Sequence, residues 1–261
     1  MQMTSTEHWG RRPCDWAELA EPANEALFAE VLSRLELGPG VRLLDIGCGS
    51  GYAARLAAAL GATVTGIDIT PELLAIARER APDAQFVEGE MDALPFPDSA
   101  FDAAVGFNAF PFAEDPVTAV REAARVTRPG GLVAATTFAE PERNESTALH
   151  LALEPLRDAP ATGAAHLPYG LSAAGGLDRL LASASLTLVT RGEVALDWTH
   201  HSVDHAVRAV LASGGGAMAI ETGGEPAARA ALERALVPFT RPDGGVCMHN
   251  VFRYAIARRA E

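Results

Sequence analysis

The feature that most constrains the fold is the segment LLDIGCGSG at residues 43–51. The apolar run at 41–46 predicts a buried strand, and the alternating glycines after it predict a tight turn that leads into a helix. Glycines at such positions let the backbone approach a ligand closely and expose N–H groups at the start of the helix. The segment therefore indicates a ligand site at the carboxyl end of a strand, in preference to a simple tight connection.

Short apolar runs alternate with helical stretches between residues 41 and 137, which predicts a parallel sheet covered by helices. The expected strands lie at 41–46, 63–67, 84–88, 101–107 and 132–137, and the helices lie at 51–60, from Pro71 onward and at 117–127. Thr70 before Pro71 and Asp115 before Pro116 predict helix caps. Further elements are expected as helices at 16–35, 173–184, 203–212 and 226–237, and as strands at 186–196 and 246–258.

The charge balance excludes several classes of protein. The 261 residues carry a formal charge of −13, which opposes binding to a phosphate backbone, so we expect no nucleic-acid partner. All 21 cationic residues are arginine, which rules out Schiff-base and P-loop lysine chemistry. The three cysteines show no metal or disulfide spacing, and no apolar run is long enough for a signal peptide or a membrane span. We therefore expect one cytoplasmic domain over residues 1–261, with no membrane partner.

A dinucleotide site is the rival interpretation of the glycine segment. Gly49, Gly51 and Ala54 fit the loose G-x-G-x-x-A pattern, and Asp68 lies where a ribose-binding acid is expected. Asp45 argues against it, because this carboxylate precedes the turn that would hold the pyrophosphate. Two negative charges about 4 Å apart cost on the order of 4 kcal/mol at an effective dielectric of about 20. A ligand with a cationic end fits this position better.

Five ordered motifs resemble those of the class I S-adenosylmethionine-dependent methyltransferases, in particular the UbiE-like (methyltransferase-11) type of stand-alone bacterial enzymes that act on small molecules. LLDIGCGSG is similar to motif I, and GIDIT at 66–70 resembles the end of the second strand. GEMDALPF at 89–96 resembles the segment that contacts the adenine, with glutamate in place of the usual aspartate. The stretches 101–116 and 125–131 resemble the fourth-strand motif and the segment before the fifth strand.

The resemblance implies a Rossmann-like α/β fold. It would have a seven-stranded, mostly parallel sheet with an antiparallel last strand, helices on both faces and helical lid insertions. S-adenosylmethionine would be the cofactor and S-adenosylhomocysteine the product. The implied roles are ribose binding by Asp68, adenine contacts from Ile69, Glu90 and Met91, and contacts to the methionine end from Phe107. The donor-binding residues would together be Asp45, Gly47, Cys48, Gly49, Asp68, Ile69, Glu90, Met91 and Phe107.

Residues outside the 41–137 core would then bind the acceptor. An N-terminal arm at 1–40, carrying Trp9 and Trp16, and insertions at 138–172 and 197–245 would close over it. The candidate general bases are His200, His201, His249 and Tyr169. Arg11 and Arg12 are candidates for holding the donor's carboxylate. We expect no metal site, since only His201 and His205 have ligand spacing and they lack a third partner.

The function expected from these features is methyl transfer to O, N or C of a small organic metabolite, in secondary metabolism, by a monomer or homodimer. Neither the acceptor nor its reacting atom can be identified from the sequence. Two alternatives remain open at this point. The same fold could bind the donor as a scaffold for cyclisation or isomerisation, and a nicotinamide oxidoreductase would share the glycine turn.

Overall fold

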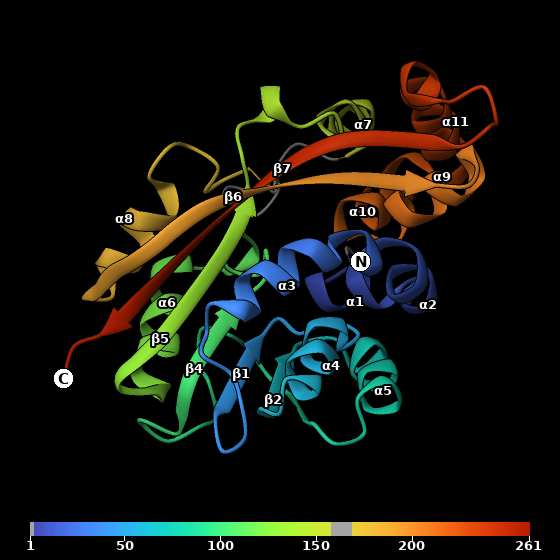
Figure 1. Cartoon of the computed structure of the whole chain (residues 1–261). Helices are drawn as coiled ribbons and strands as arrows, with labels where there is room; N and C mark the ends of the chain where they lie inside the picture. Colours follow the sequence, from blue (N-terminus) through green and yellow to red (C-terminus); the bar gives the residue numbers. More distant parts are fainter. Residues whose placement is uncertain (1–2, 158–168) are drawn as a thin grey trace.

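The computed structural model describes residues 3–157 and 169–261. Its centre is a seven-stranded sheet in the order β3-β2-β1-β4-β5-β7-β6 (Figure 1). The strands are β1 (Arg42–Ile46), β2 (Thr63–Asp68), β3 (Gln85–Glu88), β4 (Phe101–Gly106), β5 (Thr127–Phe138), β6 (Leu186–His200) and β7 (Val246–Arg259). β1 to β5 pair in parallel, and β7 runs antiparallel between β5 and β6. The predicted fold, including the reversed last strand, is confirmed.

Side-chain alternation along the central strands places helices on both faces of the sheet. Leu43 and Val105 face one core cluster with α3 (Glu25–Ser33) and α4 (Tyr52–Ala59), whereas Leu44 and Ala104 face another. The second cluster is covered by α6 (Pro116–Val126) and α8 (Gly176–Ser183). α5 (Pro71–Arg80) packs beside α4 and against β2 and β3. Because both faces are buried, the strands read as apolar runs in the sequence.

β6 and β7 extend beyond the other strands as a two-stranded ribbon, and a helical cap packs on it (Figure 1). The cap contains α7 (Thr147–Leu153), α9 (Val203–Leu211), α10 (Gly214–Gly223) and α11 (Glu225–Leu236). Buried side chains of α7, α9, α10, α11 and β7, among them Leu149, Val207, Leu232 and Met248, form a third core cluster. Short 3-10 turns connect other elements at Phe110–Phe112, Pro141–Arg143, Glu154–Leu156 and Val237–Phe239. No described helix has the length and hydropathy of a membrane span.

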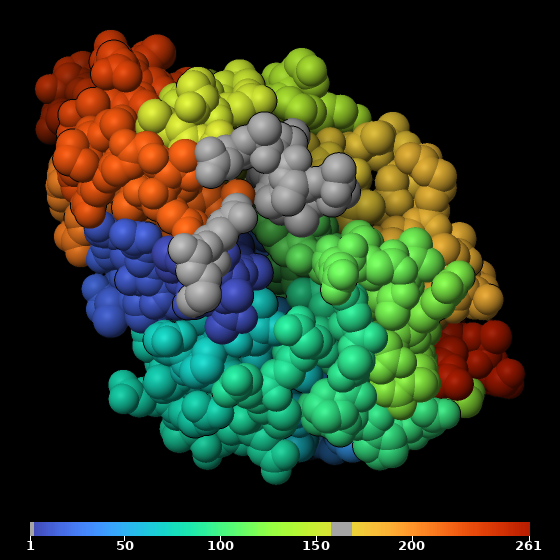
Figure 2. Space-filling model, turned by 180° about the vertical axis from the view of Figure 1, so that it is seen from behind, coloured from blue at the N-terminus to red at the C-terminus, as the bar shows by residue number. Residues whose placement is uncertain are grey.

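The N-terminal arm lies between this cap and the sheet. It contains α1 (Ser5–Gly10), α2 (Pro13–Asp15), a π turn at Trp16–Ala20 and a 3-10 turn at Glu21–Asn24. α1 contacts α10 and α5, and Figure 2 shows the blue arm between the orange helices of the cap and the teal part of the core.

Several elements differ from the prediction. The helix expected at 16–35 is α3 alone, preceded by the π and 3-10 turns, because Pro22 has no N–H to donate within a helix. α7 and α10 were not predicted, and part of the 138–172 insertion falls outside the described residues. Asp115 caps α6 as expected, with its side chain accepting from the N–H of Val117 at 3.0 Å. Thr70 makes no side-chain cap, and the carboxylate of Asp68 accepts from its N–H instead.

Candidate functional site

The turn after β1 depends on its glycines. Gly47, Gly49 and Gly51 have φ angles of 68°, 53° and 77°, in the left-handed region that favours glycine. A Cβ at Gly47 would lie 2.7 Å from the side chain of Ala109, and one at Gly51 would lie 2.9 Å from that of Ala77. The turn is therefore held tightly against α5 and the segment after β4.

Two carboxylates stand at this turn, as the sequence predicts. Asp68, at the end of β2, accepts hydrogen bonds from the N–H of Gly49 and of Thr70, both at 2.9 Å. Asp45, on β1, is 2% exposed, and its Oδ2 has no hydrogen-bond partner. Burial, reinforced by the negative charges of Glu21 and Asp68, raises the pKa of Asp45 to about 8. Burial also raises the pKa of Asp68.

The unpartnered oxygen of Asp45 is the observation that tests the fit of a cationic donor. A buried acceptor without a partner costs free energy until a donor group or a positive charge reaches it. The sulfonium and ammonium groups of S-adenosylmethionine are of this kind, and a phosphate is not. The residues at the turn therefore fit this cofactor.

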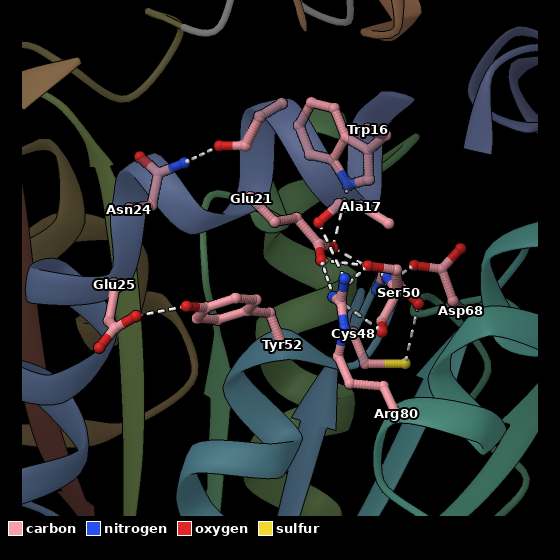
Figure 3. A network of polar contacts seen from close by, with 12 residues as sticks. Trp16, Ala17, Glu21, Asn24, Glu25, Cys48, Ser50, Tyr52, Asp68 and Arg80 are labelled. Carbon is pink, nitrogen blue, oxygen red and sulfur yellow. Dashed lines mark hydrogen bonds and ion pairs between the residues drawn. The ribbon is translucent and has the colours of Figure 1, made fainter. Parts of the chain in front are cut away.

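A third carboxylate, that of Glu21, belongs to the N-terminal arm and was not predicted from the sequence (Figure 3). Glu21 is 5% exposed and accepts from the N–H of Ser50 at 2.8 Å and from the indole N–H of Trp16 at 3.0 Å. Its second oxygen accepts from the hydroxyl of Ser50 and pairs with Arg80 at 2.7 Å. Burial raises the pKa of Glu21, and the bonds to Ser50 and Arg80 oppose that rise.

Arg80, at the end of α5, completes this network. Its guanidinium donates to the carbonyl oxygen of Ser50 at 3.1 Å and to that of Ala17 at 2.8 Å (Figure 3). The start of α4, where a dinucleotide would place its pyrophosphate, thus already holds the carboxylate of Glu21. A nicotinamide dinucleotide is therefore disfavoured, because its pyrophosphate would have to replace the carboxylate of Glu21 on the N–H of Ser50. No local pattern marks Glu21, because its contact with Ser50 joins positions 29 apart.

The remaining predicted donor residues lie around the turn and in the core beside it. Cys48 is buried with its sulfur toward Gly66, and burial raises its pKa well above the usual value. Ile69 is half-buried, and Glu90 is exposed. The methyl carbon of Met91 lies 3.9 Å from the position of a Cβ on Gly47, which places it beside the turn. Phe107 packs edge-on against Phe28 of α3 with 4.7 Å between ring centroids, so its ring belongs to the core. The assignment of these residues to the donor stays a prediction.

The arm brings two aromatic residues, Trp9 and Trp16, together with the segment after β4. The ring of Trp9 lies 4.9 Å from that of Trp16 and 5.6 Å from that of Phe112, centroid to centroid. A Cβ on Gly214, at the start of α10, would lie 2.9 Å from the Trp9 ring. Trp9 therefore joins the arm, the segment after β4 and the cap at one point.

The structure does not bring the four candidate bases together. His200 ends β6, where its Nδ1 lies 2.9 Å from Nδ1 of His205, and burial lowers its pKa to about 4. The ring of His201 stacks edge-on against His205 with centroids 4.2 Å apart. His249, on β7, is exposed and pairs with Asp197, which raises its pKa.

Tyr169 lies elsewhere, in an aromatic cluster at the carboxyl end of β5. Its hydroxyl is 2.8 Å from that of Thr147, and its ring is 5.3 Å from that of Phe138. His150, which was not among the candidates, lies in the same cluster, 5.6 Å from the Tyr169 ring. Burial lowers the pKa of His150 to about 4, so its imidazole is neutral at physiological pH. The neutral imidazole of His150, on α7, can accept a proton, but the burial that lowers its pKa also makes it a weaker base than an exposed histidine.

The two arginines proposed for the donor carboxylate contact other parts of the chain. Arg12 pairs with Glu225 of α11 at 2.7 Å, and Arg11 donates to the sulfur of Met3 at 3.5 Å. Arg12 thus ties the arm to the cap.

Comparison with known proteins agrees with the geometry. Residues 44–135 match the family profile of a methyltransferase domain. Over these residues the chain is similar to methyltransferase domains, in agreement with the resemblance that the motifs indicated.

Relatives of known sequence match only part of the chain. A malonyl-[acyl-carrier protein] O-methyltransferase of Erwinia pyrifoliae is 36% identical over 172 residues, which are 66% of this chain and 63% of that enzyme. The chain spans about half the length or less of the other curated relatives it matches.

Two solved structures share the fold. A methyltransferase-like protein from Bacillus halodurans aligns with a TM-score of 0.60 at 18% identity, over 90% of this chain and 100% of that one. The [4+2]-cyclase SpnF aligns with a TM-score of 0.59 at 25% identity, over 92% of this chain and 83% of that one.

Proposed function

We propose that the protein transfers the methyl group of S-adenosylmethionine to an O, N or C atom of a small organic metabolite. The observation that carries this proposal is the buried Asp45 oxygen without a partner, beside Asp68 at the glycine turn of a region similar to methyltransferase domains. The Erwinia relative is named for methyl transfer to oxygen, which is one of these outcomes. We place the reaction in the cytoplasm and in secondary metabolism, and assign it to a monomer or homodimer without a nucleic-acid or membrane partner.

Each of the residues at the site would have its own role. Asp68 accepts from the ribose hydroxyls, Asp45 faces the cationic end of the donor, and Met91 flanks the adenine. S-adenosylmethionine supplies an activated methyl group, which an acceptor atom attacks in line with the leaving sulfur. Such a displacement depends mainly on proximity and on exclusion of water. His150 or Tyr169 would take the acceptor's proton where the acceptor carries one.

A donor-binding test addresses the first half of this proposal. Asp68→Ala should weaken S-adenosylmethionine binding about tenfold or more, since a hydrogen bond to a charged group contributes about 1.5–3 kcal/mol. The matched control is Asp83→Ala, which removes an exposed carboxylate of the same domain. Calorimetric titration should separate the two variants. Equal affinities would contradict the assignment of Asp68.

The second candidate function is a donor-binding scaffold that catalyses cyclisation or isomerisation without methyl transfer. The likeness to a [4+2]-cyclase, at 25% identity, is the observation that favours it. Release of S-adenosylhomocysteine during incubation with a panel of carboxylate, hydroxyl and amine acceptors separates the two functions. Tight donor binding with no S-adenosylhomocysteine formed from any acceptor would support the scaffold.

A further inference from the structure

We propose that Asp197, Cys247 and His249 form a binding site for a divalent ion of the zinc type on the ribbon of β6 and β7. One ligand atom from each side chain, the Asp197 carboxylate oxygen, the Cys247 sulfur and a His249 ring nitrogen, lies within 4.8 Å of the other two. The proposal is independent of the methyl-transfer function, because these side chains stand on the ribbon and away from the glycine turn. It departs from our expectation of no metal site, which rested on spacing in the sequence.

The register of the ribbon explains how the three side chains meet. Asp197 on β6 pairs with His249 on β7, and the next residue on the same face, Thr199, pairs with Cys247. Residues two apart on a strand point to the same face. Three ligands from two antiparallel strands therefore converge, although Asp197 and His249 are 52 positions apart in the sequence.

The chemistry of the ligands selects the kind of ion. A thiolate, an imidazole and a carboxylate together suit zinc, which binds sulfur at about 2.3 Å and nitrogen or oxygen at about 2.0–2.2 Å in a tetrahedron. Nδ1 of His249 is 2.5 Å from Oδ1 of Asp197, so the pair must open by roughly 1 Å to admit an ion with such bond lengths. Both side chains are more than half exposed and free to make this adjustment, and water can fill the fourth position.

The surroundings of the site carry charges of both signs. Glu145 accepts from the backbone N–H of His249 at 2.6 Å, and it lines a shallow groove with Cys247, His249 and Arg241. The carboxylates of Asp197 and Glu145 raise the pKa of His249, and Arg241 opposes them. Binding of an M²⁺ ion would form bonds to sulfur, nitrogen and oxygen and would release the thiol proton, together with the ring proton wherever the imidazole is protonated.

Bound there, the ion would join β6 to β7 close to the cap. Val246 and Met248 alternate with Cys247 and His249 along β7 and are buried in the core cluster of the cap. The site thus lies on the outer face of the strand whose inner face holds the cap. An ion would stabilise the folded ribbon because the site is assembled only when the two strands pair.

The test uses the untagged, reduced full-length protein after treatment with a chelator. Titration with Co²⁺ should produce a thiolate-to-cobalt charge-transfer band in the near ultraviolet and the strong visible bands of a four-coordinate ion, and Zn²⁺ should bleach both. Cys247→Ser should abolish the charge-transfer band, and His249→Gln should weaken affinity at least about tenfold. Cys14→Ser, which removes an exposed cysteine of the arm, is the matched control and should bind Co²⁺ as the wild type does.

Two results would overturn the proposal. One is the absence of a charge-transfer band at millimolar Co²⁺, and the other is a band that survives in Cys247→Ser but disappears in Cys14→Ser. Circular dichroism of each variant shows whether it is folded. Donor affinity measured in parallel should stay unchanged in all three variants, so a failure of this proposal is distinguishable from a failure of the methyl-transfer function.

Discussion

The surroundings of the Asp45 carboxyl group disfavour its ionised form when no ligand is bound. The group is fully buried next to two other acids, and its Oδ2 has no hydrogen-bond partner. Its pKa of about 8 means that the folded protein keeps a proton there at neutral pH, whereas the unfolded chain releases it near pH 4. The unfolded state therefore binds fewer protons than the folded state between these values, and stability falls as the pH rises through this window.

Asp45→Asn should separate stability from donor binding. Asparagine cannot ionise, so the variant should avoid up to about 1.4 kcal/mol of lost stability per pH unit between pH 5 and pH 8. At pH 8.5, where Asp45 is mostly ionised, the same change removes the negative charge that faces the donor and should weaken donor binding. Urea unfolding at pH 5.5 and pH 8.5, with calorimetry at pH 8.5, checks both effects. If the free energy of unfolding falls by the same amount in the variant and the wild type between pH 5.5 and pH 8.5, the raised pKa of Asp45 is contradicted.

His150 and Tyr169 can be distinguished at the same scale. The imidazole of His150 is neutral because its pKa is lowered to about 4, and burial raises the pKa of Tyr169, so the phenol keeps its proton. If His150 accepts the acceptor's proton, His150→Gln should lower kcat about 10²–10⁴-fold. Tyr169→Phe should then change kcat little. Steady-state kinetics with an acceptor that yields S-adenosylhomocysteine checks this, and a larger loss in Tyr169→Phe would reverse the assignment.

At the scale of elements, the arm and α5 are joined by one buried ion pair. Glu21–Arg80 is the only ion pair between the arm and α5 among those of residues 3–157 and 169–261. Arg80→Ala leaves the Glu21 carboxylate buried without its cation, which should cost about 3–5 kcal/mol. The control is Arg78→Ala, an exposed position on the same helix. Urea unfolding of the two variants should differ by this amount, and a shared small effect would show that the pair is dispensable.

The same elements show what the sequence could and could not predict. The strands of the core were predictable because each is an apolar run between helices. Motif I marked Asp45, and the GIDIT segment at 66–70 marked Asp68. Glu21 and His150 were not predictable, since each acts through contacts made only in the folded chain. α10 begins with three glycines, which have low helix propensity, and forms because α1, α9 and α11 pack against it. The expected helix at 16–35 was divided for a local reason, because Pro22 has no backbone N–H to donate.

At the scale of the whole molecule, the cap has a core of its own. Leu232 of α11 is fully buried in the cluster of α7, α9, α10, α11 and β7, apart from the two clusters that flank the sheet. Leu232→Ala should cost about 2–5 kcal/mol through the cavity it leaves. We expect hydrogen exchange to speed up in α9 and α11 first and to stay slow in β1 and β4. Uniform acceleration over the whole chain would show that cap and core unfold as one unit.

The position of β7 has a consequence for how the chain is made. β7 lies between β5 and β6, yet it is the last of the three to leave the ribosome. Until then β5 and β6 have no strand between them, and each presents an unpaired backbone edge of the kind that associates with other chains. A ribosome-bound nascent chain that ends before residue 246 should therefore bind chaperones that recognise exposed strands. Synthesis of β7 should abolish this binding, because β7 then pairs with both β5 and β6.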